Sequence, residues 1–160
     1  MYKNLSNTLN EIEEDYGGDI TFIPKASIEV TENAEKELGI KLPKVLKYFY
    51  SKETNGLIID NKRIYSLYDK ENKKTFSDNL QRANNPKTSF WFKYKPEIFK
   101  DYLVIGADLN ICFAIYRHNE IENPSIYICE NPNTKEEIIL EKLDVNLEDL
   151  IKIMIENTFS

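Results

Sequence analysis

The chain has little of the material from which most catalytic and nucleotide-binding motifs are made. Its 160 residues include five glycines, one histidine and two cysteines. Phosphate-binding loops use the patterns G-x-G-x-x-G or G-x-x-x-x-G-K-[ST], because glycine lets the backbone amides approach the phosphate closely. Neither pattern occurs among the glycines, which are Gly17, Gly18, Gly39, Gly56 and Gly106. The sequence therefore excludes the common phosphate-binding motifs.

The single histidine and the two cysteines also lack a reactive context. His118 lies in the turn-like stretch YRHNE, and nucleophilic catalysis needs such a base beside a serine or cysteine. Cys112 and Cys129 each lie inside an apolar run, which predicts buried thiols rather than a disulfide. Acidic stretches such as EIEED show no metal-ligand spacing. We predict no catalytic residue, no metal and no cofactor; a hydrolase or nuclease that uses His118 is the enzymatic alternative.

Long apolar runs are missing as well. No run approaches the roughly 20 residues that span a bilayer, and the polar, acidic N-terminal stretch has no apolar core of a signal peptide. We expect a cytoplasmic protein. A chain of this length is most simply one domain, covering residues 1–160.

The first third of the chain shows helical periodicity, interrupted by glycine and proline. Apolar residues recur every three or four positions over residues 2–16, which predicts an amphipathic helix. Ser27 or Thr31 can cap a second helix, with Ile28, Ala34 and Leu38 facing inward and Gly39 as its stop. Pro43 suits the first turn of a third helix, which Asn55-Gly56 terminates.

The remainder reads mainly as strands. LIID and RIYSLYD predict a hairpin that turns at Asn61-Lys62, and a polar helix is expected over residues 75–83. Three further strands are predicted in YLVIG, ICFAIY and SIYICE, with KEEIIL as a fourth; their linkers are too short for parallel crossovers. Asn146 and Asp149 can form a capping box on a closing helix. The predicted fold is α+β: N-terminal helices, a mostly antiparallel sheet and a closing C-terminal helix.

The net charge of −6 is unevenly distributed. Residues 1–118 contain 18 Lys/Arg and 17 Asp/Glu, whereas residues 119–160 contain three Lys and ten acidic residues. Acidic surface repels phosphate backbones, so we expect no nucleic-acid partner. It would attract a basic protein, although a solvated face that serves solubility explains the same charge.

The segment AEKELGIKLPKVLKYFYSKETNG, residues 34–56, resembles the signature of the SUKH superfamily, the Smi/Knr-type domain. It combines a helix ending in E-x-x-L-G-x-x-L-P, a second helix with inward aromatic residues, and Asn-Gly at fixed spacing. DYLVIGADLNICFAIY resembles the strand of this family that ends in Ile-Gly, and the likeness extends over about residues 27–158. The matching positions, which are mainly structural in the family, are Glu35, Leu38, Gly39, Leu42, Pro43, Phe49, Asn55, Gly56, Ile105 and Gly106.

The resemblance implies an α+β fold and a non-catalytic role. Bacterial members are immunity proteins that bind and neutralise the toxins of polymorphic toxin systems, commonly nucleases, whereas a eukaryotic branch regulates cell-wall synthesis through protein interactions. The abundance of Ile, Lys and Asn fits an AT-rich bacterial genome and favours the first branch. From the C-terminal acidity we predict a basic toxin as partner. The predicted contact residues lie on the late strands and turns, with the tyrosines as anchors: Asp108, Tyr116, Glu120, Glu122, Tyr127, Glu130, Glu136 and Glu137.

A second hypothesis makes the chain a regulatory or small-molecule-binding module without a toxin. Its pocket would be lined by Trp91, Phe92 and neighbouring tyrosines. The same aromatic residues also suit ordinary core packing, which leaves both interpretations open.

Overall fold

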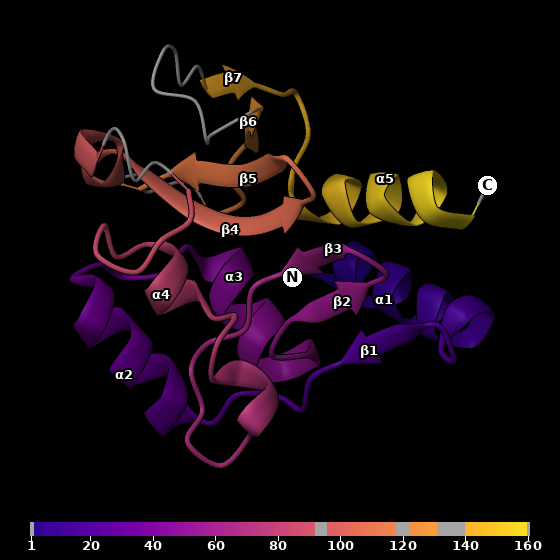
Figure 1. Ribbon diagram of the computed structural model, residues 1–160. Coiled ribbons are helices and arrows are strands. Elements are labelled where there is room, and N and C mark those ends of the chain that lie inside the picture. Colours follow the sequence, from indigo (N-terminus) through magenta and orange to yellow (C-terminus); the bar gives the residue numbers. More distant parts are fainter. Residues whose placement is uncertain (1, 92–95, 118–121, 131–139, 160) are drawn as a thin grey trace.

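A seven-stranded antiparallel sheet, in which each strand pairs with the next one in the sequence, organises the fold (Figure 1). The computed structural model describes residues 2–91, 96–117, 122–130 and 140–159. Two-residue turns join the second strand to the third and the fourth to the fifth, which imposes antiparallel pairing there, whereas long segments with helices separate the first strand from the second and the third from the fourth. The strands are β1 (Ile20–Phe22), β2 (Leu57–Ile59), β3 (Lys62–Ile64), β4 (Tyr102–Asp108), β5 (Ile111–Tyr116), β6 (Tyr127–Glu130) and β7 (Leu140–Lys142).

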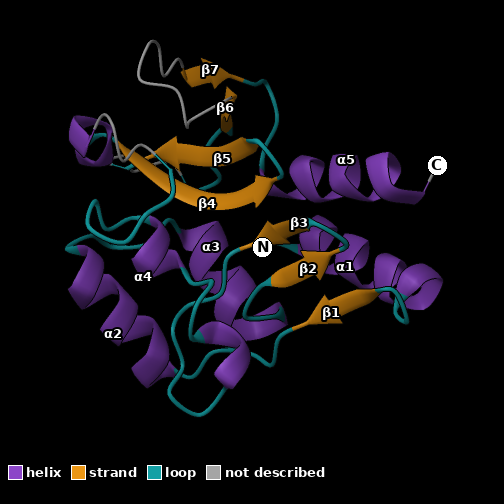
Figure 2. Ribbon diagram, viewed as in Figure 1, coloured by secondary structure: helices purple, strands orange, loops and turns teal. Residues whose placement is uncertain are grey.

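Helices flank this sheet on two sides. Figure 2 shows α2 and α4 on one side of the molecule and α1 and α5 on the other. The described helices are α1 (Lys3–Tyr16), α2 (Ile28–Leu38), α3 (Lys44–Tyr48), α4 (Leu80–Ala83) and α5 (Leu147–Phe159), with a π-helical turn at Phe49–Glu53 and 3₁₀ turns at Lys73–Thr75 and Pro96–Lys100. The α+β prediction is confirmed.

The central strand β4 lies in the middle of the core. Leu103, Val104 and Ile105 are consecutive and all three are fully buried. Successive side chains of a strand point to opposite faces, so β4 is covered on both sides. Gly106 follows a bulge in β4, and a Cβ there would lie 2.5 Å from the Arg63 carbonyl oxygen of β3. Glycine at this position allows β3 to approach closely.

The signature segment holds the N-terminal helices against the sheet. The Ser27 hydroxyl caps α2 by accepting a hydrogen bond from the Val30 N–H, and Gly39 ends this helix with a φ of 71°. The Glu35 carboxylate then accepts from the Leu42 N–H at 2.8 Å, which fixes the chain as it enters α3. Arg117, at the end of β5, donates to the carbonyl oxygens of Leu38 and Phe99. One guanidinium therefore ties the C-terminus of α2 to the sheet.

Asn55 has a further structural role in this segment. Its fully buried side chain donates from Nδ2 to the Leu67 carbonyl at 3.0 Å and accepts at Oδ1 from the Leu67 N–H at 2.8 Å. Asn84 makes the same pair of bonds with Val104 of β4, at 2.8 and 2.7 Å. Each amide thus satisfies a buried N–H and a buried C=O, as a neighbouring strand would.

Four predictions about local structure need correction or fall partly outside the described residues. Ile28 was expected to face the core but is 76% exposed, because the buried face of α2 uses Thr31, Ala34 and Leu38. The first hairpin turns at Asp60-Asn61, not at Asn61-Lys62. Helix α4 begins only at Leu80, because Asn79 bonds to local carbonyls and caps the helix. Of the predicted strand KEEIIL only Leu140 is described, at the start of β7.

Candidate protein-interaction surface

The first candidates for an enzyme site among the described residues are the two cysteines and any cluster of metal ligands. No three potential ligands of the types His, Cys, Asp and Glu converge to hold a metal ion in this part of the chain. Cys112 and Cys129 face each other across β5 and β6 as free, fully buried thiols, as predicted. A hydrogen bond with Cys129 and burial raise the pKa of the Cys112 thiol, so it stays protonated and unreactive. His118 lies outside the described residues.

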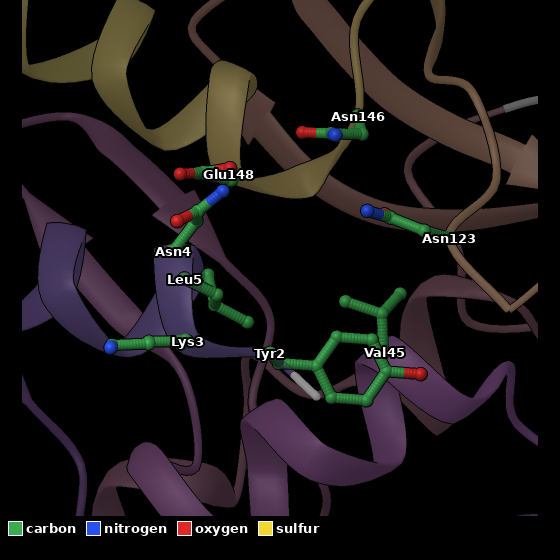
Figure 3. Close-up of a pocket in the computed structure, with 8 residues that line it drawn as sticks. All are labelled: Tyr2, Lys3, Asn4, Leu5, Val45, Asn123, Asn146 and Glu148. Carbon is green, nitrogen blue, oxygen red and sulfur yellow. The ribbon is translucent and has the colours of Figure 1, made fainter.

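The hollow drawn in Figure 3 lies where the start of α1 meets α3 and the N-terminus of α5. Its volume is about 230 Å³ and most of its lining is polar, including Asn4, Asn123, Asn146 and Glu148. Two causes raise the pKa of the Tyr2 phenol at this site: the larger is its removal from solvent, and the smaller is the neighbouring Glu122 carboxylate. Ligand pockets usually exceed roughly 300 Å³ and are mainly apolar. We therefore do not interpret this hollow as a small-molecule site.

The aromatic pocket of the second hypothesis is also small. Trp91 is buried, and its indole N–H donates to the Tyr65 hydroxyl at 2.7 Å. The hollow beside it has a volume of about 100 Å³, and Phe92 lies outside the described residues. Trp91 therefore acts first as a core residue.

A tyrosine cluster lies on the late strands. Tyr102 of β4 contacts Tyr116 of β5 and Tyr127 of β6, with ring centroids 5.9 and 5.1 Å apart and edge-to-face geometry. Tyr116 is 38% exposed and the other two are half-buried. Burial raises the pKa of the Tyr102 phenol, and the electrostatic interaction with Tyr127 is the second cause of this rise. Two predicted anchors, Tyr116 and Tyr127, are thus brought into one cluster, and sequence reasoning missed Tyr102 at its centre.

Two of the predicted acidic contact residues, Asp108 and Glu130, do not share a face of the sheet with these tyrosines. Asp108, Ile111 and Glu130 lie opposite one another across β4, β5 and β6, on the face of the sheet that Tyr116 does not use. Glu122, in the turn before β6, forms an ion pair with Lys44 of α3 at 3.0 Å. Three further predicted positions lie outside the described residues: Glu120, Glu136 and Glu137.

The largest addition to the predicted surface comes from α1. This helix and the turn after it carry Lys3 against five exposed acidic residues: Glu11, Glu13, Glu14, Asp15 and Asp19. Helix α1 packs against α5: Thr8 donates to the Glu148 carboxylate at 3.2 Å, and the rings of Tyr16 and Phe159 stack at 4.2 Å. We call the exposed sides of these two helices, with the four acidic residues of α1, Asp19 in the turn after it and Glu156 of α5, the acidic helical face.

Sequence reasoning missed this face for an identifiable reason. The charge count over residues 1–118 combined the acidic first helix with a basic middle part, and the two nearly cancelled. The run EIEED was visible, but only the packing of α1 on α5 places it beside the acidic C-terminal quarter. A count for each predicted helix would have found it.

Comparison with known proteins supports the signature. The model of the SMI1 / KNR4 family (SUKH-1) matches residues 25–152, about four fifths of the chain. A comparison with curated proteins found no match. Among the described helices, none combines the length and apolar character needed to cross a bilayer.

Proposed function

This chain belongs to the SMI1 / KNR4 family (SUKH-1), and we propose that it is a non-catalytic, cytoplasmic immunity protein that binds and neutralises a cognate toxin of the nuclease type. The observation that carries the proposal is the family membership, and the exposed carboxylates and tyrosines of the described surface support it. In this proposal the protein works by occupying the toxin, and it performs no chemistry.

The charge of the acidic helical face supports a basic partner. A nuclease needs a positively charged cleft to hold its phosphate backbone, and an acidic protein surface competes for the same charges. Exposed carboxylates also steer a basic partner toward the surface, which raises the association rate by about 10- to 1,000-fold. The tyrosine cluster would add rigid aromatic contact area on the late strands.

Charge reversal on α1 tests which surface the toxin contacts. We expect Glu11→Lys with Glu14→Lys to slow association with the toxin by roughly tenfold or more at low salt, because two steering charges are inverted. Stopped-flow or surface plasmon resonance against a cognate toxin, sought among the products of neighbouring genes, measures the rate, and the same variant should protect toxin-expressing cells poorly.

A matched control exists on α2. Glu29→Lys with Glu32→Lys reverses two exposed glutamates at the same spacing and changes the net charge equally, but it lies away from the acidic helical face. If both double variants slow association equally, net charge rather than this face is responsible. If the unmodified chain neither binds the toxin nor protects cells, the proposed function itself fails.

A further inference from the structure

Exposed aromatic side chains surround Arg82 on the side of the molecule away from the acidic helical face. Tyr68, Phe76 and Phe90 are 42%, 43% and 51% exposed, and the rings of Tyr68 and Phe76 lie 5.7 Å apart. We call these three residues together with Arg82 the Arg82 patch. Arg82 belongs to α4, which Figure 1 places across the molecule from α5. The acidic helical face proposed above to bind the toxin therefore lies across the molecule from this patch (Figure 1).

Two hollows flank Arg82. The larger, about 270 Å³, lies between α2 and α4 and is lined by Glu37, Tyr68, Phe76 and Gln81. The smaller, about 100 Å³, is lined by Phe90 and by the buried Tyr65 and Trp91. Arg82 and Asn79 line both hollows, so Arg82 borders two places that a partner's side chains could occupy.

The segment that carries the patch, residues 68–90, holds five Lys/Arg and three Asp/Glu, a net charge of +2 in a chain whose net charge is −6. Arg82 makes no ion pair with the described residues, and the same holds for four exposed lysines near it in the sequence: Lys70, Lys73, Lys74 and Lys87. Asp78, which lines the smaller hollow with Arg82, forms an ion pair with Arg63, whereas Asp69 accepts only a backbone hydrogen bond from the N–H of Glu71, which does not offset its charge. Glu37 and Glu71 are exposed and only partly offset the five cations. The excess of cations in this region is small, and Arg82 is the cation that lines both hollows.

The backbone beneath the patch is fixed. The Asn79 Oδ1 accepts from the Arg82 N–H at 2.9 Å, and the Thr88 hydroxyl donates to the Arg82 carbonyl at 2.9 Å. Gln81 Oε1 accepts from the Tyr68 N–H at 3.1 Å, which links the two sides of the larger hollow. A surface that is ordered before binding loses less entropy when a partner docks.

We propose that the Arg82 patch binds an acidic peptide segment of a second partner protein. The segment carries an Asp or Glu whose carboxylate pairs with the Arg82 guanidinium, with an apolar side chain on each side of it. A large side chain such as Leu or Phe fills the larger hollow, and a small one such as Ala or Val the smaller hollow. Arginine and aromatic residues dominate the strongest contacts of protein interfaces, and the planar guanidinium suits a carboxylate. This partner is opposite in charge to the toxin and uses a different surface.

Two pools of synthetic peptides test the proposal. Peptides of the first pool have five positions: apolar residues at the first and fifth, Asp or Glu at the third, and variable residues at the second and fourth. Peptides of the second pool are identical except that the third position is Asn or Gln. Neither pool contains Trp, so Trp91, the single tryptophan of the chain, reports binding by its fluorescence. We expect the immobilised protein to retain peptides of the acidic pool, as identified by mass spectrometry.

Variants then locate the binding site. For a retained peptide we expect Arg82→Gln and Phe76→Ala each to weaken binding at least about tenfold, as central interface residues do. Lys36→Gln and Leu109→Ala, an exposed cation and an exposed apolar residue elsewhere, should leave it unchanged. Circular dichroism should show all four variants folded, because Arg82→Gln keeps the backbone bonds described above. The proposal is overturned if neither pool is retained, if both are retained equally, or if the two patch variants bind as the unmodified protein does.

Discussion

Replacing Asn55 by alanine is expected to lower the free energy of unfolding by about 4 kcal/mol, because a buried polar group left unsatisfied costs roughly 1–3 kcal/mol and the change leaves two. These are the N–H and the C=O of Leu67, which bond only to the Asn55 amide in the described structure. Leu67 is fully buried, so water cannot replace the lost partners without opening the core. Urea denaturation followed by circular dichroism measures the change.

Asn33→Ala is the matched control for this prediction. Asn33 lies on the exposed side of α2, and alanine has the higher helix propensity, so a change within about 0.5 kcal/mol is expected. A loss below about 1 kcal/mol for Asn55→Ala would mean that the Leu67 backbone finds other partners, contrary to this interpretation.

Gly56→Ala is expected to destabilise the protein by roughly 3 kcal/mol or more, because backbone strain and a steric clash act together. The φ of Gly56 is 111°, a conformation that residues with a Cβ rarely adopt. A Cβ there would also lie 2.7 Å from the Ser66 Oγ and 2.9 Å from the Ile64 carbonyl oxygen. Thermal or urea unfolding should show the loss as a lower midpoint.

Two other glycines separate strain from clash. Gly39 has a φ of 71° but open space around its Cβ position, so alanine there should cost about 1 kcal/mol through strain alone. Gly18 has neither feature, and alanine should change stability by less than about 0.5 kcal/mol. The expected order of cost is Gly18, Gly39, Gly56; an equal cost at Gly39 and Gly56 would contradict the role assigned to the Gly56 contacts.

Sequence reasoning predicted the features that short segments determine. The caps at Ser27, Gly39 and Asn146 are confirmed, and Asn146 and Asp149 exchange hydrogen bonds at 3.1 and 3.0 Å as a capping box. Each of these depends on residues within a few positions of one another. The antiparallel order of the late strands followed equally from short linkers.

The errors about the helices arose where polar residues are buried, or where polar side chains bond to backbone groups that a helix would otherwise use. Thr31 is buried in α2 and bonds to the Ser27 carbonyl, so a search for apolar residues chose the exposed Ile28 instead. Thr75 and Asn79 bond to local backbone groups before Leu80 and delay the start of α4. The pairing of Asn55 with Leu67 and of Asn84 with Val104 joins distant segments, and no local pattern indicates it.

The candidate site was less predictable than the fold. The signature from residue 34 to residue 56 identifies the family, and its residues have structural roles. Glu35 accepts a hydrogen bond from the Leu42 N–H, and the Asn55 amide bonds to the Leu67 backbone. The surfaces proposed for binding lie elsewhere, on α1 with α5 and around Arg82. Their composition was visible in the sequence, but only the fold places α1 beside α5 and Phe76 beside Tyr68.

Stoichiometric titration of the toxin tests the proposed function most directly. A candidate nuclease toxin from a neighbouring gene is purified and mixed with increasing amounts of the chain, and its nuclease activity is measured after short and long incubation. Neutralisation by binding predicts that activity falls linearly to zero near one equivalent, at a level that does not change with incubation time. Inactivation that proceeds with time at a small fraction of an equivalent would reveal an enzyme, and full activity at excess would show that this toxin is not bound; either result would contradict the proposal.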